Sequence, residues 1–385
     1  MVFSSRTNWN LAANPLSATL ERHRASGRPL LDLTISNPTE CGFAHDVAIL
    51  SALPNPASLA YTPEPRGLEV ARRAVSEYYA GRGDCVSIDD LFLTTSTSEA
   101  YSFVFRLLCN PGDEILIPAP SYPLFDYLAE LQDVKLVRYP LIYDHGWQID
   151  FHELERAITE RTRGVIVVHP NNPTGHFCKP TEIARLNQIC SDSSLAIVAD
   201  EVFLDFALSG ERVAGFAGNL PSLTFTLSGI SKICGLPQMK VAWLAVSGPA
   251  DLKRAAIARL EVIADTFLSM NAPVQLALQA FLELRHEFQQ RLMDRVRTNL
   301  VNLDERLAAQ TTCSRLEFEG GWYALMRVPV TRSDEELAIE LISSRDVYVH
   351  PGHFFDFPGD GYLVVSLLPP DNLFSEAISR LLSYF

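Results

Sequence analysis

Short apolar runs alternate with amphipathic helical patterns through most of the chain, and this alternation predicts the fold. Near-continuous apolar runs, typical of strands, occur at 113–120, 134–141, 164–170, 195–203, 222–229 and 240–248. Several segments between them have helical periodicity, namely 98–109, 123–132, 151–162 and 181–190. Strands that are apolar on both faces and separated by helices are typical of a mostly parallel sheet sandwiched by helices. We therefore expect an α/β protein whose ligand site lies at the carboxyl ends of these strands.

The pattern changes in the last third of the chain. From about 251 to 310 it is helical and long, and after 314 short strands and helices return. We expect a large α/β domain over 45–275. The residues 1–44 and 276–385 are expected to form a smaller α/β domain, with the N-terminal segment joining the C-terminal one.

Composition narrows the class of protein. The chain has 385 residues, 47% of them apolar, and a formal net charge of -14. Such an acidic chain argues against nucleic acid or an anionic membrane as a partner. Its seven cysteines are dispersed without paired spacing, which predicts reduced thiols and no metal site. The N-terminus lacks a signal-peptide pattern and no apolar run reaches membrane-spanning length, so we expect a cytoplasmic protein.

Polar residues are concentrated where predicted strands end. The run "TTSTSEA" (94–100) is a Ser/Thr-rich turn that opens a helix, and "HPNNPTGHF" (169–177) is an Asn-Pro turn after an apolar strand. Backbone N–H groups at a helix start, together with hydroxyls, suit a phosphate group. The same run also reads as a helix cap followed by a capping-box glutamate. The Asn-Pro turn equally needs no function, because both residues initiate turns.

Two charged residues also lie at strand ends. Asp200, in "VADEVF" (198–203), ends an apolar strand, where a carboxylate is costly to bury unless it meets a cation or a donor. Its alternative role is to cap the next element. Lys232 lies in the Ser/Gly turn of "LSGISKICGLPQMKVAW" (227–243). Partial burial would lower its pKa and make it a candidate Schiff-base nucleophile, whereas the alternative is a solvated side chain.

Taken together and in this order, these segments resemble a known family. The motifs "NNPTG", "DEVF" and "SGISKICGLP" resemble those of the fold-type I pyridoxal-phosphate enzymes, in the class I/II aminotransferase group. The resemblance extends over nearly the whole chain, from "DLTISNPTE" (32–40) to the end. It implies pyridoxal 5'-phosphate as the cofactor.

The resemblance also implies roles for individual residues. Lys232 corresponds to the lysine that forms the internal aldimine and then moves the Cα proton. Asp200 corresponds to the partner of the pyridine nitrogen, which keeps that nitrogen protonated. Asn172 is similar to the donor to the ring's phenolic oxygen, and Tyr122 to the aromatic residue that stacks on the ring.

The remaining implied contacts involve the phosphate and the substrate. The phosphate-binding residues would be Ser96, Thr97, Ser98, Ser231 and Lys240. Tyr61 matches a tyrosine that reaches the phosphate in the neighbouring subunit, which implies a homodimer with shared active sites. The substrate side would be lined by Ser36, Asn37 and Asn172.

Three positions depart from the family pattern. Lys240 stands where an arginine is usual. A lysine binds the cofactor's phosphate as a point charge, whereas an arginine forms two parallel hydrogen bonds to it. Phe203 stands where a tyrosine donates to the phenolic oxygen, and its loss is expected to raise the aldimine pKa. Val364 stands where an arginine binds the substrate's α-carboxylate. Either another cation replaces that arginine, with Arg66 and His353 as candidates, or the amino substrate has no free α-carboxylate.

The sequence thus favours an aminotransferase that acts on an amino donor and a keto-acid acceptor through Lys232. A pyridoxal-phosphate lyase on the same scaffold is the alternative, because elimination shares the early steps. A non-catalytic cofactor-binding regulator is a further alternative. The acidic chain and the absence of an appended DNA-binding pattern argue against it.

Overall fold

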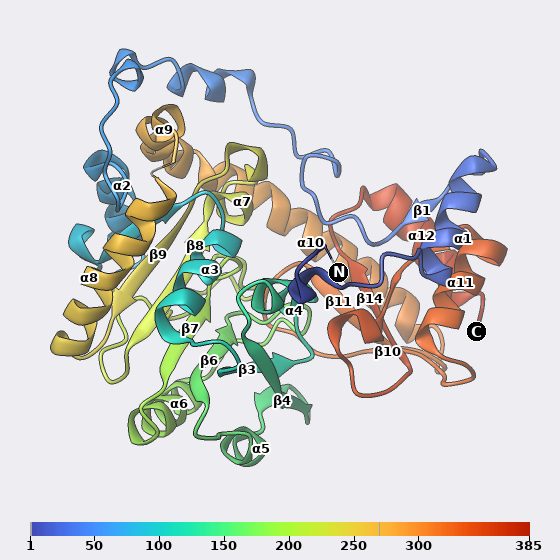
Figure 1. Ribbon diagram of the computed structural model, residues 1–385. Helices are drawn as coiled ribbons and strands as arrows, with labels where there is room; N and C mark the ends of the chain where they lie inside the picture. The colour runs from blue at the N-terminus through green and yellow to red at the C-terminus, as the bar shows by residue number, and fades with distance from the viewer. Residues whose placement is uncertain (1, 269) are drawn as a thin grey trace.

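The computed structural model describes residues 2–268 and 270–385 and contains one large sheet (Figure 1). Its strands are β2 (Leu91–Thr94), β3 (Glu114–Ala119), β4 (Lys135–Tyr143), β5 (Trp147–Ile149), β6 (Thr162–Val168), β7 (Ala196–Asp200), β8 (Thr224–Gly229) and β9 (Ala242–Ser247). They lie in the order β2-β9-β8-β7-β6-β3-β4-β5. The pairings from β8 through β4 are parallel, while β9 and β5 run antiparallel to their neighbours. The predicted α/β fold with a mostly parallel sheet is therefore confirmed.

Helices cover both faces of this sheet because its strands are apolar on both sides. In β6, Ile166 and Val168 face a core cluster that includes α3 (Thr97–Leu108) and α8 (Ala250–Phe267). The alternate residues, Val165 and Val167, face a cluster that includes α6 (Pro180–Asp192). Near β2 and β9 the second face is covered by α2 (Glu69–Gly81) and α9 (Ala272–Glu283). Successive strand residues thus face opposite sides, and the fold has three layers, a sheet between two layers of helices.

One predicted helix was too long. The segment 151–162 forms α5 only over Phe151–Arg156, and β6 already begins at Thr162. The Thr162 hydroxyl accepts a hydrogen bond from the backbone N of Thr159 at 2.9 Å, and the Thr159 hydroxyl donates to Glu114 of β3 at 2.7 Å. Threonine side chains that bond to nearby backbone compete with helix continuation.

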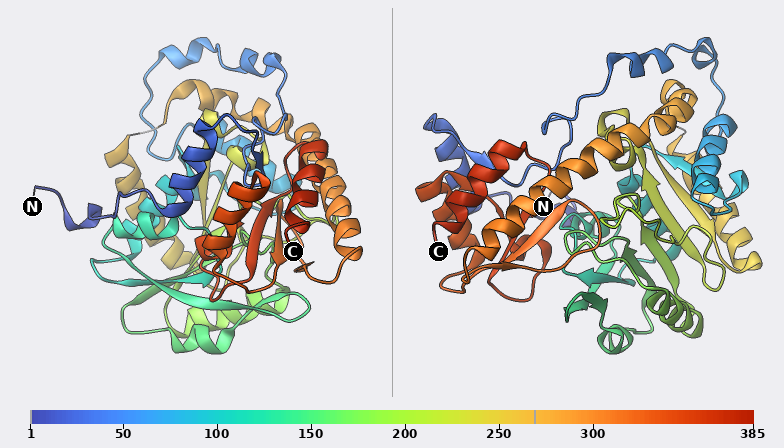
Figure 2. Two further views of the ribbon diagram at one scale, coloured as in Figure 1. Left: turned by 90° about the vertical axis from the view of Figure 1, so that its right-hand side faces the viewer. Right: turned by 180° about the vertical axis from the view of Figure 1, so that it is seen from behind.

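The N-terminal and C-terminal segments together form a smaller unit. Its antiparallel sheet has the order β10 (Ser314–Arg315), β11 (Tyr323–Arg327), β14 (Tyr362–Ser366), β13 (His350–Pro351). Separately, β1 (Leu31–Asp32) pairs in parallel with β12 (Val347–Tyr348). The helices of this unit are α1 (Pro15–Ala25), α11 (Asp334–Arg345) and α12 (Asp371–Leu382). The long α10 (Arg285–Ala308) runs from the large sheet to them (Figure 2). The exact domain boundaries stay a prediction.

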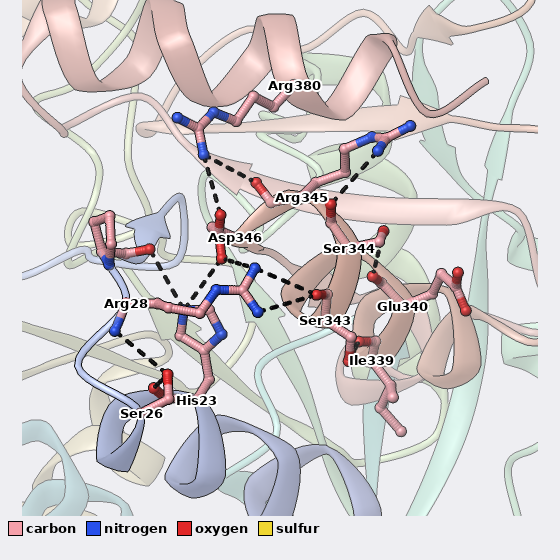
Figure 3. Close-up of polar contacts among 11 residues, drawn as sticks. His23, Ser26, Arg28, Ile339, Glu340, Ser343, Ser344, Arg345, Asp346 and Arg380 are labelled. Atoms are coloured by element: carbon pink, nitrogen blue, oxygen red, sulfur yellow. Dashed lines mark hydrogen bonds and ion pairs between the residues drawn. The ribbon is translucent and has the colours of Figure 1, made fainter.

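A group of ion pairs around Asp346 fixes the N-terminal segment to this unit (Figure 3). Asp346 ends α11, and its carboxylate contacts Arg28 at 2.5 Å and Arg380 of α12 at 3.3 Å. His23 of α1 lies 3.6 Å from the same carboxylate. Three segments that are distant in sequence therefore converge on one acidic side chain.

The remaining elements are short, and two of them border the site described below. These elements are α4 (Phe125–Glu130), α7 (Ile230–Ile233), η1 (Ser5–Thr7), η2 (Val47–Ala52), η3 (Pro56–Leu59), η4 (Ile88–Asp90), η5 (Pro237–Met239) and η6 (Gly352–Phe355). Within residues 2–268 and 270–385, no helix combines the length and the apolar character needed to cross a membrane.

Candidate active site

A cavity of about 210 Å³ lies at the carboxyl ends of the central strands. The ends of β2, β6, β7 and β8 each lead directly into residues of its wall, as expected for a parallel sheet. Nine of the predicted site residues line it, namely Ser36, Ser96, Thr97, Ser98, Tyr122, Asn172, Asp200, Ser231 and Lys232. Residues that are up to 196 positions apart in the sequence thus meet around one small space.

Lys232 lies on α7, directly after β8 ends at Gly229. A Cβ at Gly229 would lie 2.8 Å from the Cβ of Ala242 in β9, so the turn that presents Lys232 requires glycine. The Lys232 Nζ lies 5.5 Å from the centre of the Phe203 ring and 5.2 Å from that of Trp322. Burial lowers the pKa of Lys232 to about 8, partly opposed by the Asp200 carboxylate. A pKa near neutrality gives the amine an appreciable neutral, nucleophilic fraction.

Asp200 is the last residue of β7, and its carboxylate is held by two donors. The Tyr101 hydroxyl donates to Oδ2 at 3.0 Å, and the backbone N of Val202 donates to Oδ1 at 3.2 Å. Burial raises the pKa of Asp200 to about 6, while these two hydrogen bonds and the Lys232 charge oppose the rise. Asp200 is therefore ionised at neutral pH and offers a buried negative charge to the cavity.

The neutral polar residues of the wall come from three further segments. Ser96 caps α3, its hydroxyl accepting a hydrogen bond from the backbone N of Glu99 at 3.1 Å. The cap that sequence offered as the alternative is thus present, and the same helix start opens into the cavity. Asn172 is buried, and its Oδ1 has no hydrogen-bond partner among the described residues. A buried, unpaired amide oxygen in a cavity wall suits a bound polar group.

Three predicted site residues lie outside this cavity wall. Asn37 donates to Glu40 Oε1 at 3.1 Å. Lys240 is exposed at the end of η5, two residues before Ala242, which does line the wall. Tyr61 is 79% exposed and lines a separate hollow. The predicted roles of these three residues therefore need either side-chain movement or a second subunit.

Val364, the residue that replaces the carboxylate-binding arginine of the resemblance, is fully buried. In β14 it lies opposite Leu325 of β11 and His350 of β13. Burial lowers the pKa of His350 to about 4, so this neighbour carries no charge at neutral pH. Over the described ranges 2–268 and 270–385, the cavity wall contains Lys232 as its one basic side chain.

The two candidate replacement cations are also outside the wall. Arg66 forms an ion pair with Glu261 at 2.7 Å and donates to the backbone O of Asp89 at 2.9 Å. His353 is exposed on η6. Neither contributes a side chain to the cavity.

Four aromatic residues at the site were not predicted from the sequence, namely Tyr101, Phe125, Trp322 and Tyr323. The segment 320–329 forms the core strand β11, and it also reaches the site, because Trp322 contacts Lys232 and Tyr323 lines the cavity. Burial raises the pKa of Tyr323 to about 12, so its phenol is neutral. Tyr101 was read only as part of an apolar helical pattern. Two features of the sequence could have indicated three of them. Two glycines precede the Trp322-Tyr323 pair, and Tyr101 has a hydroxyl on the buried face of its helix.

A cluster of His176, Cys178 and Glu182 lies outside the cavity wall, with potential metal ligands within 4.8 Å of one another. The two Glu182 carboxylate oxygens already accept hydrogen bonds from the backbone N of Ile149 and of Lys179, each at 2.8 Å. The His176 Nε2 lies 3.1 Å from the Glu182 carboxylate. The cluster is accounted for as a buried cap at the start of α6.

Comparison with known proteins identifies the family. Residues 47–381 match the family model described as aminotransferase class I and II. The chain is 27% identical over 382 residues to the glutamate-pyruvate aminotransferase AlaA of Haemophilus influenzae, covering 95% of this chain and 93% of that protein. It is 31% identical over 272 residues to AlaA of Escherichia coli, covering 70% of this chain and 67% of that protein.

A solved structure supports the same fold. The alanine aminotransferase of Pyrococcus furiosus superposes with a TM-score of 0.89 at 23% identity, covering 99% of each chain. The class I and II family depends on pyridoxal phosphate and transfers nitrogenous groups. The chain belongs to the class I and II aminotransferase family, and it is an aminotransferase.

Proposed function

We propose that this aminotransferase works with pyridoxal phosphate bound in the described cavity and attached to the Lys232 amine. The observation that carries the proposal is the meeting of Lys232, Asp200 and Asn172 in one small cavity. When bound, the cofactor supplies a carbonyl that takes up the amino group and a ring that accepts the electrons of the Cα–H bond.

Each wall residue has a distinct part in this proposal. Asp200 would pair with the ring nitrogen, and the Asn172 side-chain amide would donate a hydrogen bond to the phenolic oxygen. Tyr122 would stack on one face of the ring. The phosphate would be bound by the α3 start and by nearby hydroxyls and a cation, namely Ser96, Thr97, Ser98, Ser231 and Lys240. A phosphate at a helix start gains from backbone N–H groups and the helix dipole.

Lys232 would have two tasks. Its amine would hold the cofactor, and when free it would take and return the Cα proton of the substrate. Both tasks need an unprotonated amine, and a pKa of about 8 leaves about a tenth of Lys232 unprotonated at pH 7. The faces of Phe203 and Trp322 would hold the amine when it carries a proton.

The substrates are proposed to be an amino donor and a keto-acid acceptor. The relatives named above are alanine and glutamate-pyruvate aminotransferases, so alanine, glutamate and pyruvate are the first compounds to test. Ser36, Tyr323 and Asn172 face the cavity as uncharged hydrogen-bonding groups on the substrate side. Asn37 is proposed to support this side from outside the wall.

We further propose a homodimer in which Tyr61 reaches the phosphate of the partner's site. The support is the segment 47–61, which passes over α9 (Figure 1) and has apolar side chains exposed to solvent. In this segment Val47, Leu59 and Tyr61 are 77%, 90% and 79% exposed. A run of exposed apolar side chains is typical of an interface.

The proposal is tested by spectroscopy on the purified holoenzyme. An amino donor should bleach the cofactor's visible band, and a keto acid should restore it. Lys232→Ala should abolish turnover. If donors released an eliminated fragment and no keto acid restored the band, the protein would be a lyase and the proposal would be wrong.

A further inference from the structure

Tyr101 is a buried tyrosine that contacts Asp200 from outside the cavity wall. It is 2% exposed and lies one turn into α3, the helix whose first residues line the cavity. Its hydroxyl donates to Asp200 Oδ2 at 3.0 Å. A single helix therefore presents hydroxyls to the cavity at its start and a phenol to Asp200 one turn later.

Packing fixes the direction in which this hydroxyl points. The Tyr101 ring lies 5.2 Å from the ring of Phe125, edge to face at 81°, and 5.9 Å from that of Phe105. A buried hydroxyl without a partner is costly, so the O–H is held on its acceptor. Phe125 itself lines the cavity, so the ring that holds Tyr101 is part of the site wall.

The charged and titratable groups around Asp200 come from several elements. Lys232 faces it from α7, Tyr122 from the loop after β3, Tyr101 from α3, and Glu201 follows it in the chain. Burial alone would favour the protonated carboxyl, whereas the two hydrogen-bond donors favour the carboxylate. Each Asp200 oxygen accepts one hydrogen bond and keeps a further lone pair for another partner.

We propose that Tyr101 is a positioning residue for this aminotransferase: its hydroxyl keeps the Asp200 carboxylate ionised and turned so that it can pair with the cofactor's ring nitrogen. The inference rests on the proposed function of the cavity. Tyr101 acts through Asp200 and contacts neither cofactor nor substrate. Its loss should therefore affect the ring-nitrogen contact and leave the other cofactor contacts unchanged.

Tyr139 provides a matched control. It lies in β4 of the large sheet and is also buried, and its hydroxyl donates to the backbone O of Ile166 at 2.8 Å. The change Tyr139→Phe removes a buried hydroxyl and one hydrogen bond, as Tyr101→Phe does, but the lost acceptor is a backbone oxygen and Tyr139 does not line the cavity. Any effect of a lost buried phenol on the fold alone should appear in both variants.

The test is a titration of the full-length protein with two compounds from pH 6 to 8.5. One is pyridoxal phosphate, and the other is its analogue with CH in place of the ring nitrogen. In Tyr101→Phe we expect the acid limb of binding to move up by about one pH unit, so that pyridoxal phosphate binds about fivefold more weakly at pH 6. The difference should shrink above pH 8. Affinity for the analogue, and both affinities of Tyr139→Phe, should stay within about twofold of wild type.

A second measurement needs no cofactor. The carboxyl carbon resonance of Asp200, assigned with Asp200→Asn, should titrate at higher pH in Tyr101→Phe than in wild type. Equal weakening of both compounds at every pH, or no weakening of either, would overturn the inference. If no variant bound pyridoxal phosphate but the Asp200 titration still moved, the proposed function would fail while the Tyr101–Asp200 coupling stood.

Discussion

Replacing Lys232 with methionine should make the cofactor-free protein more stable. Methionine keeps a linear apolar side chain against Phe203 and Trp322 but removes the buried amine. Burial lowers the pKa of Lys232 from 10.5 to about 8. That difference corresponds to about 3 kcal/mol of free energy against the charged amine in the folded protein. Contacts with the two aromatic faces offset about 1 kcal/mol, so the expected gain is about 2 kcal/mol at pH 7.

The sign of the pH dependence follows from proton binding. Below about pH 8 both the folded and the unfolded chain carry the proton, so the folded wild type bears the whole penalty. Between about 8 and 10.5 only the unfolded chain binds it, so wild-type stability rises with pH relative to the variant. The gain from Lys232→Met should fall to about 1 kcal/mol at pH 9.5.

Urea unfolding of the cofactor-free protein at pH 7 and pH 9.5 measures this difference. Lys240→Met is the matched control, because Lys240 is exposed in the same segment and its loss should change stability by less than about 0.5 kcal/mol. The reasoning is refuted if Lys232→Met is no more stable than wild type at pH 7. It is equally refuted if the gain is the same at both pH values.

Three further predictions concern the substrate, the dimer and the fold. Because Val364 replaces the carboxylate-binding cation, alaninamide should bleach the holoenzyme at least as fast as alanine in stopped-flow absorbance; a preference of more than about tenfold for alanine would contradict this. Mixing refolded Tyr61→Ala and Lys232→Ala subunits should restore about a quarter of wild-type activity, since half of random dimers are mixed and each has one intact site; no recovery would argue against shared sites. Gly175→Ala should destabilise the protein by more than about 2 kcal/mol in thermal or urea unfolding, because φ is +67° and the new Cβ would lie 2.5 Å from the Gly320 backbone O; a loss below 1 kcal/mol would contradict it.

Sequence predicted the scaffold and the polar half of the site for one physical reason. Strands buried on both faces are apolar throughout, so polar residues at their carboxyl ends are conspicuous and fall on one edge of the sheet. The segments that hold Asn172, Asp200 and Lys232 were singled out in this way, the resemblance implied their roles, and the structure brings all three to one cavity. Their distances depend on the strand order, with β6, β7 and β8 adjacent, which no local pattern encodes.

The aromatic half of the site could not be read in the same way. Tyr101, Trp322 and Tyr323 lie in apolar runs, where an aromatic residue is most simply a core residue. Only the docking of the C-terminal unit on the large sheet brings Trp322 to within 5.2 Å of the Lys232 amine. Tyr61 is a different case, because its predicted partner belongs to another subunit.

One physical cause, burial, moves the two charged residues of the site in opposite directions. It raises the pKa of Asp200 to about 6 and lowers that of Lys232 to about 8, and their mutual attraction opposes both changes. Between these values Asp200 is ionised while a growing fraction of Lys232 is neutral. A fully solvated pair would leave Lys232 protonated at neutral pH, and a fully apolar pocket would neutralise Asp200 as well. The pH range from about 6 to 8, in which Asp200 is ionised and Lys232 begins to lose its proton, therefore depends on a buried cavity and on the hydrogen-bond donors of Asp200. Tyr101 is one of these donors, so it is as relevant to the proposed chemistry as the residues that line the wall.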